Sequence, residues 1–112
     1  MVDMRIRSGA VAPTAGTVYE IFLIRGDGSG NRDDNAGAVD AAITIENSAL
    51  IGTLIVTATA NKDFQRTYDT AFAGKLGTEW GIAVRNSSGQ ALNGTEGNHI
   101  KRFAPYLPVI TP

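Results

Sequence analysis

Short runs of β-branched and aromatic residues, separated by glycine-rich or polar turns, constrain the fold of this chain more than any other feature. Residues 18–24 and 50–60 are two such runs, and no segment of the 112 residues shows a sustained helical period. Runs of this length at this spacing are typical of two packed antiparallel sheets. We therefore predict an all-β fold, an antiparallel β-sandwich of about seven strands that is Ig-like or jelly-roll-like.

The expected strands differ in how much of each is apolar. Residues 18–24 are apolar on both alternating faces, which predicts a central strand covered on both sides. Residues 38–46 end in the strand pattern Ile43-Thr44-Ile45, although Ala41-Ala42 leaves a short helix open as an alternative. Residues 50–60 and 64–70 look like a hairpin around a polar turn. The remaining expected strands are residues 79–86, 99–103 and 106–110.

The chain is short enough to form one domain. Residues 8–17 are small and flexible in character, so we expect residues 1–17 to be an N-terminal arm or a first edge strand. Residues 18–112 then form the single β-sandwich domain. Pro105 and Pro108 cannot donate to a ladder, so the C-terminal end should be an edge or an extended tail.

Composition and charge exclude several classes of protein. The formal net charge of −1 argues against nucleic-acid binding driven by positive charge. The absence of cysteine excludes disulfides, thiolate metal sites and cysteine nucleophiles. The longest apolar stretch, residues 50–60, is too short and too β-branched to span a membrane. We expect a soluble protein made in the cytoplasm, with no cofactor, no nucleic-acid partner and no membrane.

A long polar loop at residues 25–37 is the clearest candidate for ligand or ion binding. Alternating oxygen-bearing side chains suit a hard cation such as calcium. A calcium loop, however, requires Gly and Glu where this chain has Arg32 and Ala38, so a solvated acidic loop is the simpler interpretation. The candidate residues of this loop are Asp27, Asn31, Asp33 and Asp34.

No catalytic arrangement is evident in the sequence. His99 is the only histidine, and none of the serines has the surroundings of a nucleophile. A glycosidase would need two carboxylates such as Glu79 and Glu96 in one cleft, which a thin β-sandwich rarely builds. We therefore predict a protein that is not an enzyme.

Arginine use suggests protein–protein contacts. Seven arginines stand against three lysines, and the guanidinium group is favoured in interfaces. Solvated strand faces remain the alternative. The expected partner contacts are Arg5, Ile6 and Arg7 near the N-terminus, and Tyr106 and Leu107 near the C-terminus.

Residues 79–92 (EWGIAVRNSSGQAL), followed by Asn98-His99 and a proline-containing end, resemble small β-sandwich proteins of tailed-phage virions. Residues 19–28 add to this similarity. The resemblance implies a capsid-decoration (cement) protein, or a head–tail or fibre-associated component, located in the virion. It implies repeated contacts with capsid or other virion proteins, as a homo-oligomer for which a trimer is one candidate. No catalytic residues carry over from such proteins.

A carbohydrate-binding or receptor-binding module is the alternative. Trp80 and the loop at residues 25–37 would then form the site, because an exposed aromatic ring can stack on a sugar. With so few aromatic residues in the chain, packing of Trp80 in the core is the competing interpretation.

Overall fold

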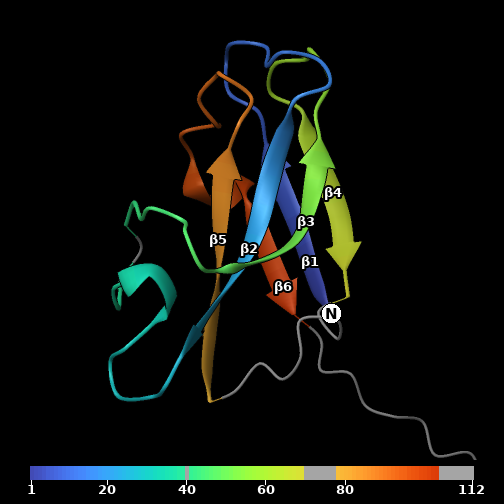
Figure 1. Cartoon of the computed structure of the whole chain (residues 1–112). Helices are drawn as coiled ribbons and strands as arrows, with labels where there is room; N and C mark the ends of the chain where they lie inside the picture. The colour runs from blue at the N-terminus through green and yellow to red at the C-terminus, as the bar shows by residue number, and fades with distance from the viewer. Residues whose placement is uncertain (40, 70–77, 104–112) are drawn as a thin grey trace, which may run out of the picture.

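The structure, a computed structural model, describes residues 1–39, 41–69 and 78–103 of the chain. The described part is all-β, with no α-helix, and its six strands form two three-stranded antiparallel sheets (Figure 1). The strand order is β4-β1-β6 in one sheet and β3-β2-β5 in the other. The strands are β1 (Val2–Arg7), β2 (Val18–Gly26), β3 (Ala49–Ile55), β4 (Asp63–Tyr68), β5 (Glu79–Asn86) and β6 (Ile100–Phe103).

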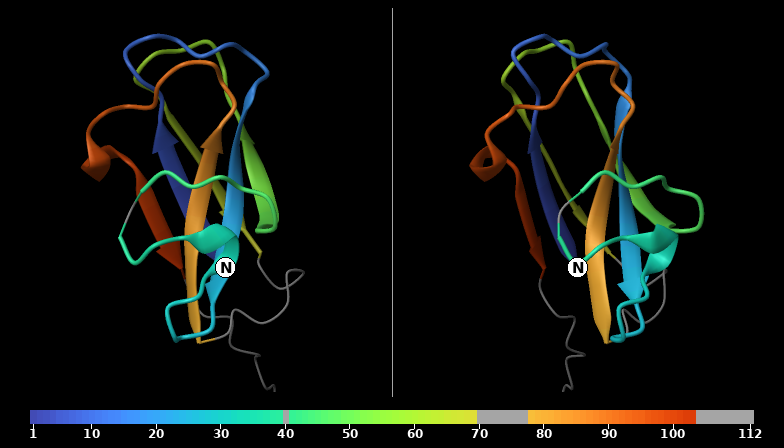
Figure 2. Two further views of the ribbon diagram at one scale, coloured as in Figure 1. Left: turned by 60° about the vertical axis from the view of Figure 1, so that its left-hand side comes forward. Right: turned by 90° about the vertical axis from the view of Figure 1, so that its left-hand side faces the viewer.

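The two sheets lie face to face, with β1 and β2 as their central strands (Figure 2). Strand β1 turns its apolar side chains inward in strict alternation, which leaves Asp3, Arg5 and Arg7 on the opposite face. Burial of one side of each sheet against the other creates the core. Both sheets contribute to it: Val2, Met4 and Ile6 from β1, and Tyr19, Ile21 and Leu23 from β2.

The expectation of an N-terminal arm is wrong for residues 2–7. This segment is the middle strand of its sheet, paired with β4 on one side and β6 on the other, so it is not an edge strand either. The alternation of apolar and charged residues explains the difference, because one face of this strand is apolar enough to be buried. Residues 8–17 form the connection from β1 to β2.

Strand β2 confirms the expectation of a central strand covered on both sides. It lies between β3 and β5, and Phe22 and Ile24 on its outer face are nearly as buried as Leu23 on its inner face. The strand expected within residues 38–46 is absent from the described part of that segment. Instead, the long connection from β2 to β3 contains a 3₁₀ turn, Asp33–Asn35, and then runs beside the β5 edge (Figure 2).

The expected hairpin of residues 50–60 and 64–70 is also wrong, because its two strands belong to different sheets. Strand β3 pairs with β2, and β4 pairs with β1. The polar turn does reverse the chain, with Asn61 at a φ of 53°, but it connects a strand of one sheet to a strand of the other. Of the seven strands expected, residues 106–110 lie outside the described residues.

Candidate functional site: an open groove between β5 and β6

The edge strands β5 and β6 stand apart and leave the inner faces of the two sheets accessible along one side of the molecule. Antiparallel pairing places Ile82 of β5 opposite Leu23, and Val84 opposite Ile21, so both side chains face inward. Val84 nevertheless keeps 37 % of its surface exposed, and Phe103 on the inner side of β6 keeps 63 %. Side chains at core-facing positions are thus uncovered on this side.

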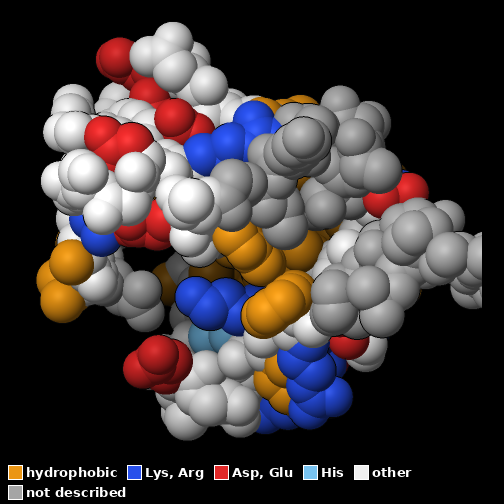
Figure 3. Space-filling view, turned by 90° about the horizontal axis from the view of Figure 1, so that it is seen from below, with side chains coloured by type: hydrophobic (Ala, Val, Ile, Leu, Met, Phe, Trp, Pro, Cys, Tyr) orange, Lys and Arg blue, Asp and Glu red, His pale blue; other side chains and the backbone are white. Residues whose placement is uncertain are grey.

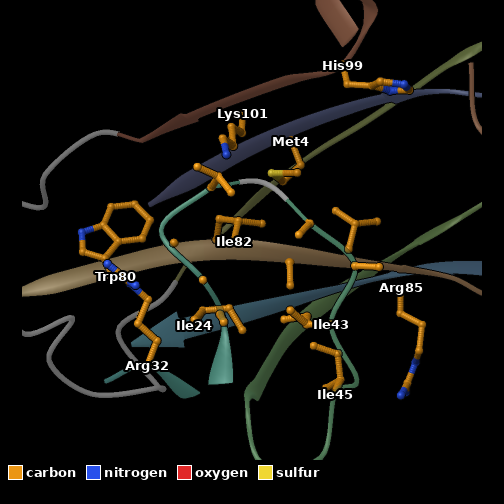
Figure 4. A pocket seen from close by; sticks show the side chains of 18 of the residues that line it. Met4, Ile24, Arg32, Ile43, Ile45, Trp80, Ile82, Arg85, His99 and Lys101 are labelled. Atoms are coloured by element: carbon orange, nitrogen blue, oxygen red, sulfur yellow. The ribbon is translucent and has the colours of Figure 1, made fainter. Parts of the chain in front are cut away.

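Ile82 and Val84 line a groove of about 920 Å³, and Phe103 lies at its lower end beside Trp80, which also lines it. Figure 4 shows its two walls, with Ile82 on β5 and Met4 on β1 projecting toward each other. Residues 36–39 and 41–45 of the β2–β3 connection border the groove, and Ile43 and Ile45 contribute to its lining. Seen from below, apolar side chains surround a hollow in which the histidine is visible beside basic groups (Figure 3).

An edge-to-face aromatic pair stands at the lower end of the groove. The rings of Trp80 on β5 and Phe103 on β6 have centroids 5.1 Å apart and planes at 88°. Trp80 is half-buried and lines the groove. This contact with Phe103 involves part of the Trp80 ring system, and the role of Trp80 as a glycan contact stays a prediction.

Most of the basic groups at the rim are already paired with carboxylates. Arg32 donates from Nε to the Glu79 carboxylate, and Arg85 Nη2 lies 2.7 Å from Oε2 of Glu20. The Arg85 guanidinium, followed by the Ser87 hydroxyl, holds the pKa of Glu20 below its usual range. Lys101, opposite Met4 on the inner side of β6, adds a positive charge to the lining, so the groove combines apolar walls with this one basic group beside the paired ones.

His99 has a structural place at the upper end of the groove. Its Nδ1 accepts a hydrogen bond from the backbone N–H of Arg7 at 3.2 Å, and its Nε2 donates to the carbonyl oxygen of Asn93 at 2.7 Å. Both ring nitrogens are therefore engaged in holding the β5–β6 connection against β1. Neither is available for proton transfer in this arrangement.

The carboxylates of the polar loop are used to fix its own backbone. Asp27 accepts hydrogen bonds from the backbone N–H of Ser29 at 2.7 Å and from the amide of Asn31 at 2.7 Å. These hydrogen bonds lower the pKa of Asp27, and the bond from the Asn31 side chain has the largest effect. Asp33 accepts from the backbone N–H of Arg25 at 3.0 Å. Each carboxylate thus serves a turn, as an Asx residue commonly does.

Asp34 ties the loop to the start of β3. Its carboxylate accepts hydrogen bonds from the Ser48 hydroxyl and from the backbone N–H groups of Asn47 and Ser48, the last two at 2.9 Å. The Ser48 hydroxyl contributes most to a pKa of about 2 for Asp34. Across residues 1–39, 41–69 and 78–103, no three His, Asp or Glu side chains gather where they could hold a metal ion. The calcium interpretation of this loop gains nothing from the geometry.

The residues expected to contact a partner are dispersed. Ile6 is 2 % exposed and belongs to the core, and it also lines the groove. Arg7 pairs through Nε with Asp63 at 2.8 Å, which raises the pKa of Arg7 and lowers that of Asp63. Arg5 lies partly exposed on the outer face of β1. Tyr106 and Leu107 lie outside the described residues.

Ile82, Val84 and Phe103 are groove residues that the sequence reasoning did not single out. The alternation in residues 79–86 does place Trp80, Ile82 and Val84 on one face. What it lacks is any sign that this face stays partly open. That depends on the separation of β5 from β6, two strands in different sheets.

Comparisons with known proteins give no identification. No family model, no curated protein and no solved structure matches the chain. Within the described part of the chain, no helix has the length and apolar character needed to cross a membrane.

Proposed function

We propose that this protein is a non-enzymatic structural protein of a phage virion, of the capsid-decoration or fibre-associated type. It binds a capsid or a related assembly through repeated protein–protein contacts, as a homo-oligomer. In this proposal the two sheets form a β-sandwich of the Ig-like or jelly-roll-like kind. Strand β1 contributes to the core. The open side of the molecule, between β5 and β6, serves as the interface.

The observation that carries the proposal is the exposure of core-facing side chains in the groove. Val84 and Phe103 occupy inward positions of strands β5 and β6, yet 37 % and 63 % of their surfaces meet solvent. Contiguous apolar surface of this kind marks an interaction site, because leaving it in water costs free energy that a partner recovers by covering it.

The opposite edge of the same sheet supports the proposal. Strand β3 is an edge strand within the described residues, and Leu50 and Ile55 point away from the core with 46 % and 70 % of their surfaces exposed. Unprotected edges are sites where further strands or subunits add. A protein with exposed apolar residues on both flanks of one sheet is suited to an assembly in which each copy has more than one neighbour.

The carbohydrate-binding alternative has less support. Trp80 lines the groove, but its ring packs edge-to-face with Phe103. The carboxylates of the loop at residues 25–37 already accept hydrogen bonds from backbone N–H groups of the protein. A glycan site on Trp80 would need one face of the ring to be open and polar groups nearby to orient the sugar.

Native mass measured by light scattering after gel filtration, over a range of protein concentration, tests the proposal. We expect a closed oligomer whose mass is constant once it has formed, because closed symmetry implies committed interfaces. A chain that stays monomeric and binds a glycan saturably, with binding lost in Trp80→Ala while the fold survives, would replace the proposal by the carbohydrate-binding one. Binding to purified virion particles is the next measurement if assembly is seen.

A further inference from the structure

The groove between β5 and β6 has the form of a site for an extended apolar segment. Its walls come from two sheets, its length follows β5, and its floor is the buried pair Met4 and Ile6. Such a segment would cover the exposed faces of Val84 and Phe103 and complete the core along the open side. Extended segments bind exposed sheet edges in this way, with pockets for alternate side chains.

The chain itself contains a segment of matching chemistry. Residues 104–112, Ala-Pro-Tyr-Leu-Pro-Val-Ile-Thr-Pro, follow β6 directly and carry no charged side chain. Tyr106, Leu107, Val109 and Ile110 are the large apolar groups. Three prolines restrict the backbone and so lower the entropy lost on binding. An uncharged, proline-stiffened segment fits an apolar groove whose rim charges are largely paired.

The length of the segment also fits. Nine residues in extended form reach about 30 Å, and the eight residues of β5 extend about 26 Å. The segment is thus long enough to run along the whole of β5.

The direction of β6 favours a groove on another copy. Strand β6 runs from the upper part of the molecule to its lower end, where β5 begins (Figure 1). To enter its own groove, the chain would have to reverse at once after Phe103. Pro105 disfavours this, because a residue that precedes proline is held in extended backbone. These two features favour a groove on another copy as the place where the segment binds.

We propose that residues 104–112 of one copy dock in the groove between β5 and β6 of a second copy, and that this contact builds the oligomer. The inference rests on the proposed function, since it names the interface through which copies meet. Because every copy has one segment and one groove, the exchange forms a reciprocal pair or a ring where the rotation between copies closes.

Three variants of the full chain test the contact. Tyr106→Asp with Leu107→Asp places charge in the segment, and Val84→Asp places charge in the groove. Each should weaken assembly at least about tenfold, because an unpaired charge would be buried at the contact. Val11→Asp, in the connection from β1 to β2, is the matched control. It puts the same charge on a residue that is 60 % exposed outside the groove, and assembly should be unchanged.

Mixing the variants separates exchange from other modes of assembly. The segment variant keeps an intact groove and the groove variant keeps an intact segment. An equimolar mixture should therefore form a mixed dimer, although each variant alone is monomeric. Trp80 is the only tryptophan of the chain and lines the groove, so its emission should shift to shorter wavelength as the mixture assembles.

The possible results discriminate clearly. An oligomer that persists in the segment variant overturns the inference and leaves the proposed function standing on another interface. A full chain that is monomeric at all concentrations, with unchanged Trp80 emission, also overturns it. Circular dichroism shows whether Val84→Asp has folded. If it has not, the segment variant still decides the outcome, once its own circular dichroism spectrum shows that it is folded.

Discussion

The two sides of this molecule differ in how well the edges of the sheets are covered. On the β3–β4 side, the ring of Tyr68 lies against Gly52, its hydroxyl donates to the carbonyl oxygen of Thr53 at 2.8 Å, and only 3 % of Tyr68 is exposed. On the β5–β6 side, the corresponding aromatic residue, Phe103, is 63 % exposed beside Trp80. The fold is thus sealed on one side by its own side chains, and it leaves the other side for a partner.

A basic residue strengthens the sealed side. Arg66 lies with its guanidinium carbon 5.2 Å from the centre of the Tyr68 ring, and it also donates to the carbonyl oxygen of Thr53 at 3.3 Å. Two side chains of β4 therefore hold one carbonyl group of β3. Because β3 and β4 belong to different sheets, these contacts fix the separation of the sheets on this side.

Removing the aromatic side chain from each side should give the largest contrast. Tyr68→Ala leaves a cavity at a buried position and should lower the free energy of unfolding by about 3–5 kcal/mol. Phe103→Ala removes an exposed ring and one edge-to-face contact, so its cost should be about 1 kcal/mol or less. Urea denaturation of dilute protein measures both. Equal losses for the two variants would contradict the distinction between sealed and open sides.

Adding a methyl group to each side should give a smaller contrast of the same sense. A Cβ at Gly52 would lie 2.3 Å from Cε1 of Tyr68, whereas a Cβ at Gly81 on β5 meets nothing within 4 Å. Gly52→Ala should therefore lower stability by about 1–3 kcal/mol. Gly81→Ala, the matched control in a strand, should be neutral or stabilising by about 0.5–1 kcal/mol, since alanine restricts the unfolded chain. Midpoints of urea unfolding compare the two, and a tolerated Gly52→Ala would show that Tyr68 can move aside.

The smallest effect concerns the connection that borders the open side. The pKa of Asp34 is about 2, below the 3.8 of an unperturbed aspartate, because the Ser48 hydroxyl and neighbouring N–H groups favour the charged carboxylate. A depressed pKa stabilises the fold above pH 4, and this contribution is lost as the pH falls toward 2. Asp34→Asn should therefore melt at a lower temperature than the parent at pH 7.

The two melting curves should converge as the pH approaches 2. Asparagine suits this comparison because it tolerates the φ of 52° at this position. Glu96→Gln, at an exposed carboxylate in the β5–β6 connection, is the control and should follow the parent at every pH. A difference between Asp34→Asn and the parent that is independent of pH would assign the effect to something other than the charge.

The sequence predicted local features of this fold better than it predicted pairing. The apolar run in residues 18–24 correctly marked a central strand, and residues 64–70 correctly marked a strand, β4, although not its pairing partner. Residues 2–7 also alternate between apolar and charged side chains, which is the pattern of a strand. The small residues that follow them suggested an arm instead. In this segment the alternation of side chains is a better guide to structure than the small residues beside it.

The predicted strand pairing was wrong because local sequence patterns do not specify which strand pairs with which. The turn at Asn61 is real, yet β3 and β4 join different sheets, since each finds more apolar surface to cover beside a central strand. Residues 43–45 have a strand pattern without a strand, because Asp34 and the 3₁₀ turn carry the connection past the β5 edge outside the ladder. The groove follows from these long-range choices, which is why no local pattern revealed it.

The position of β1 also bears on how the chain can fold as it is synthesised. Residues 2–7 leave the ribosome before both of the segments with which they pair, residues 63–68 and residues 100–103. No earlier segment can complete this sheet, so Val2, Met4 and Ile6 stay unburied in it until most of the chain has emerged. Folding through such distant contacts is slow, and the waiting strand is open to wrong partners in the meantime. Cells that make this protein in quantity therefore hold it, for part of each synthesis cycle, in a form that chaperones would recognise.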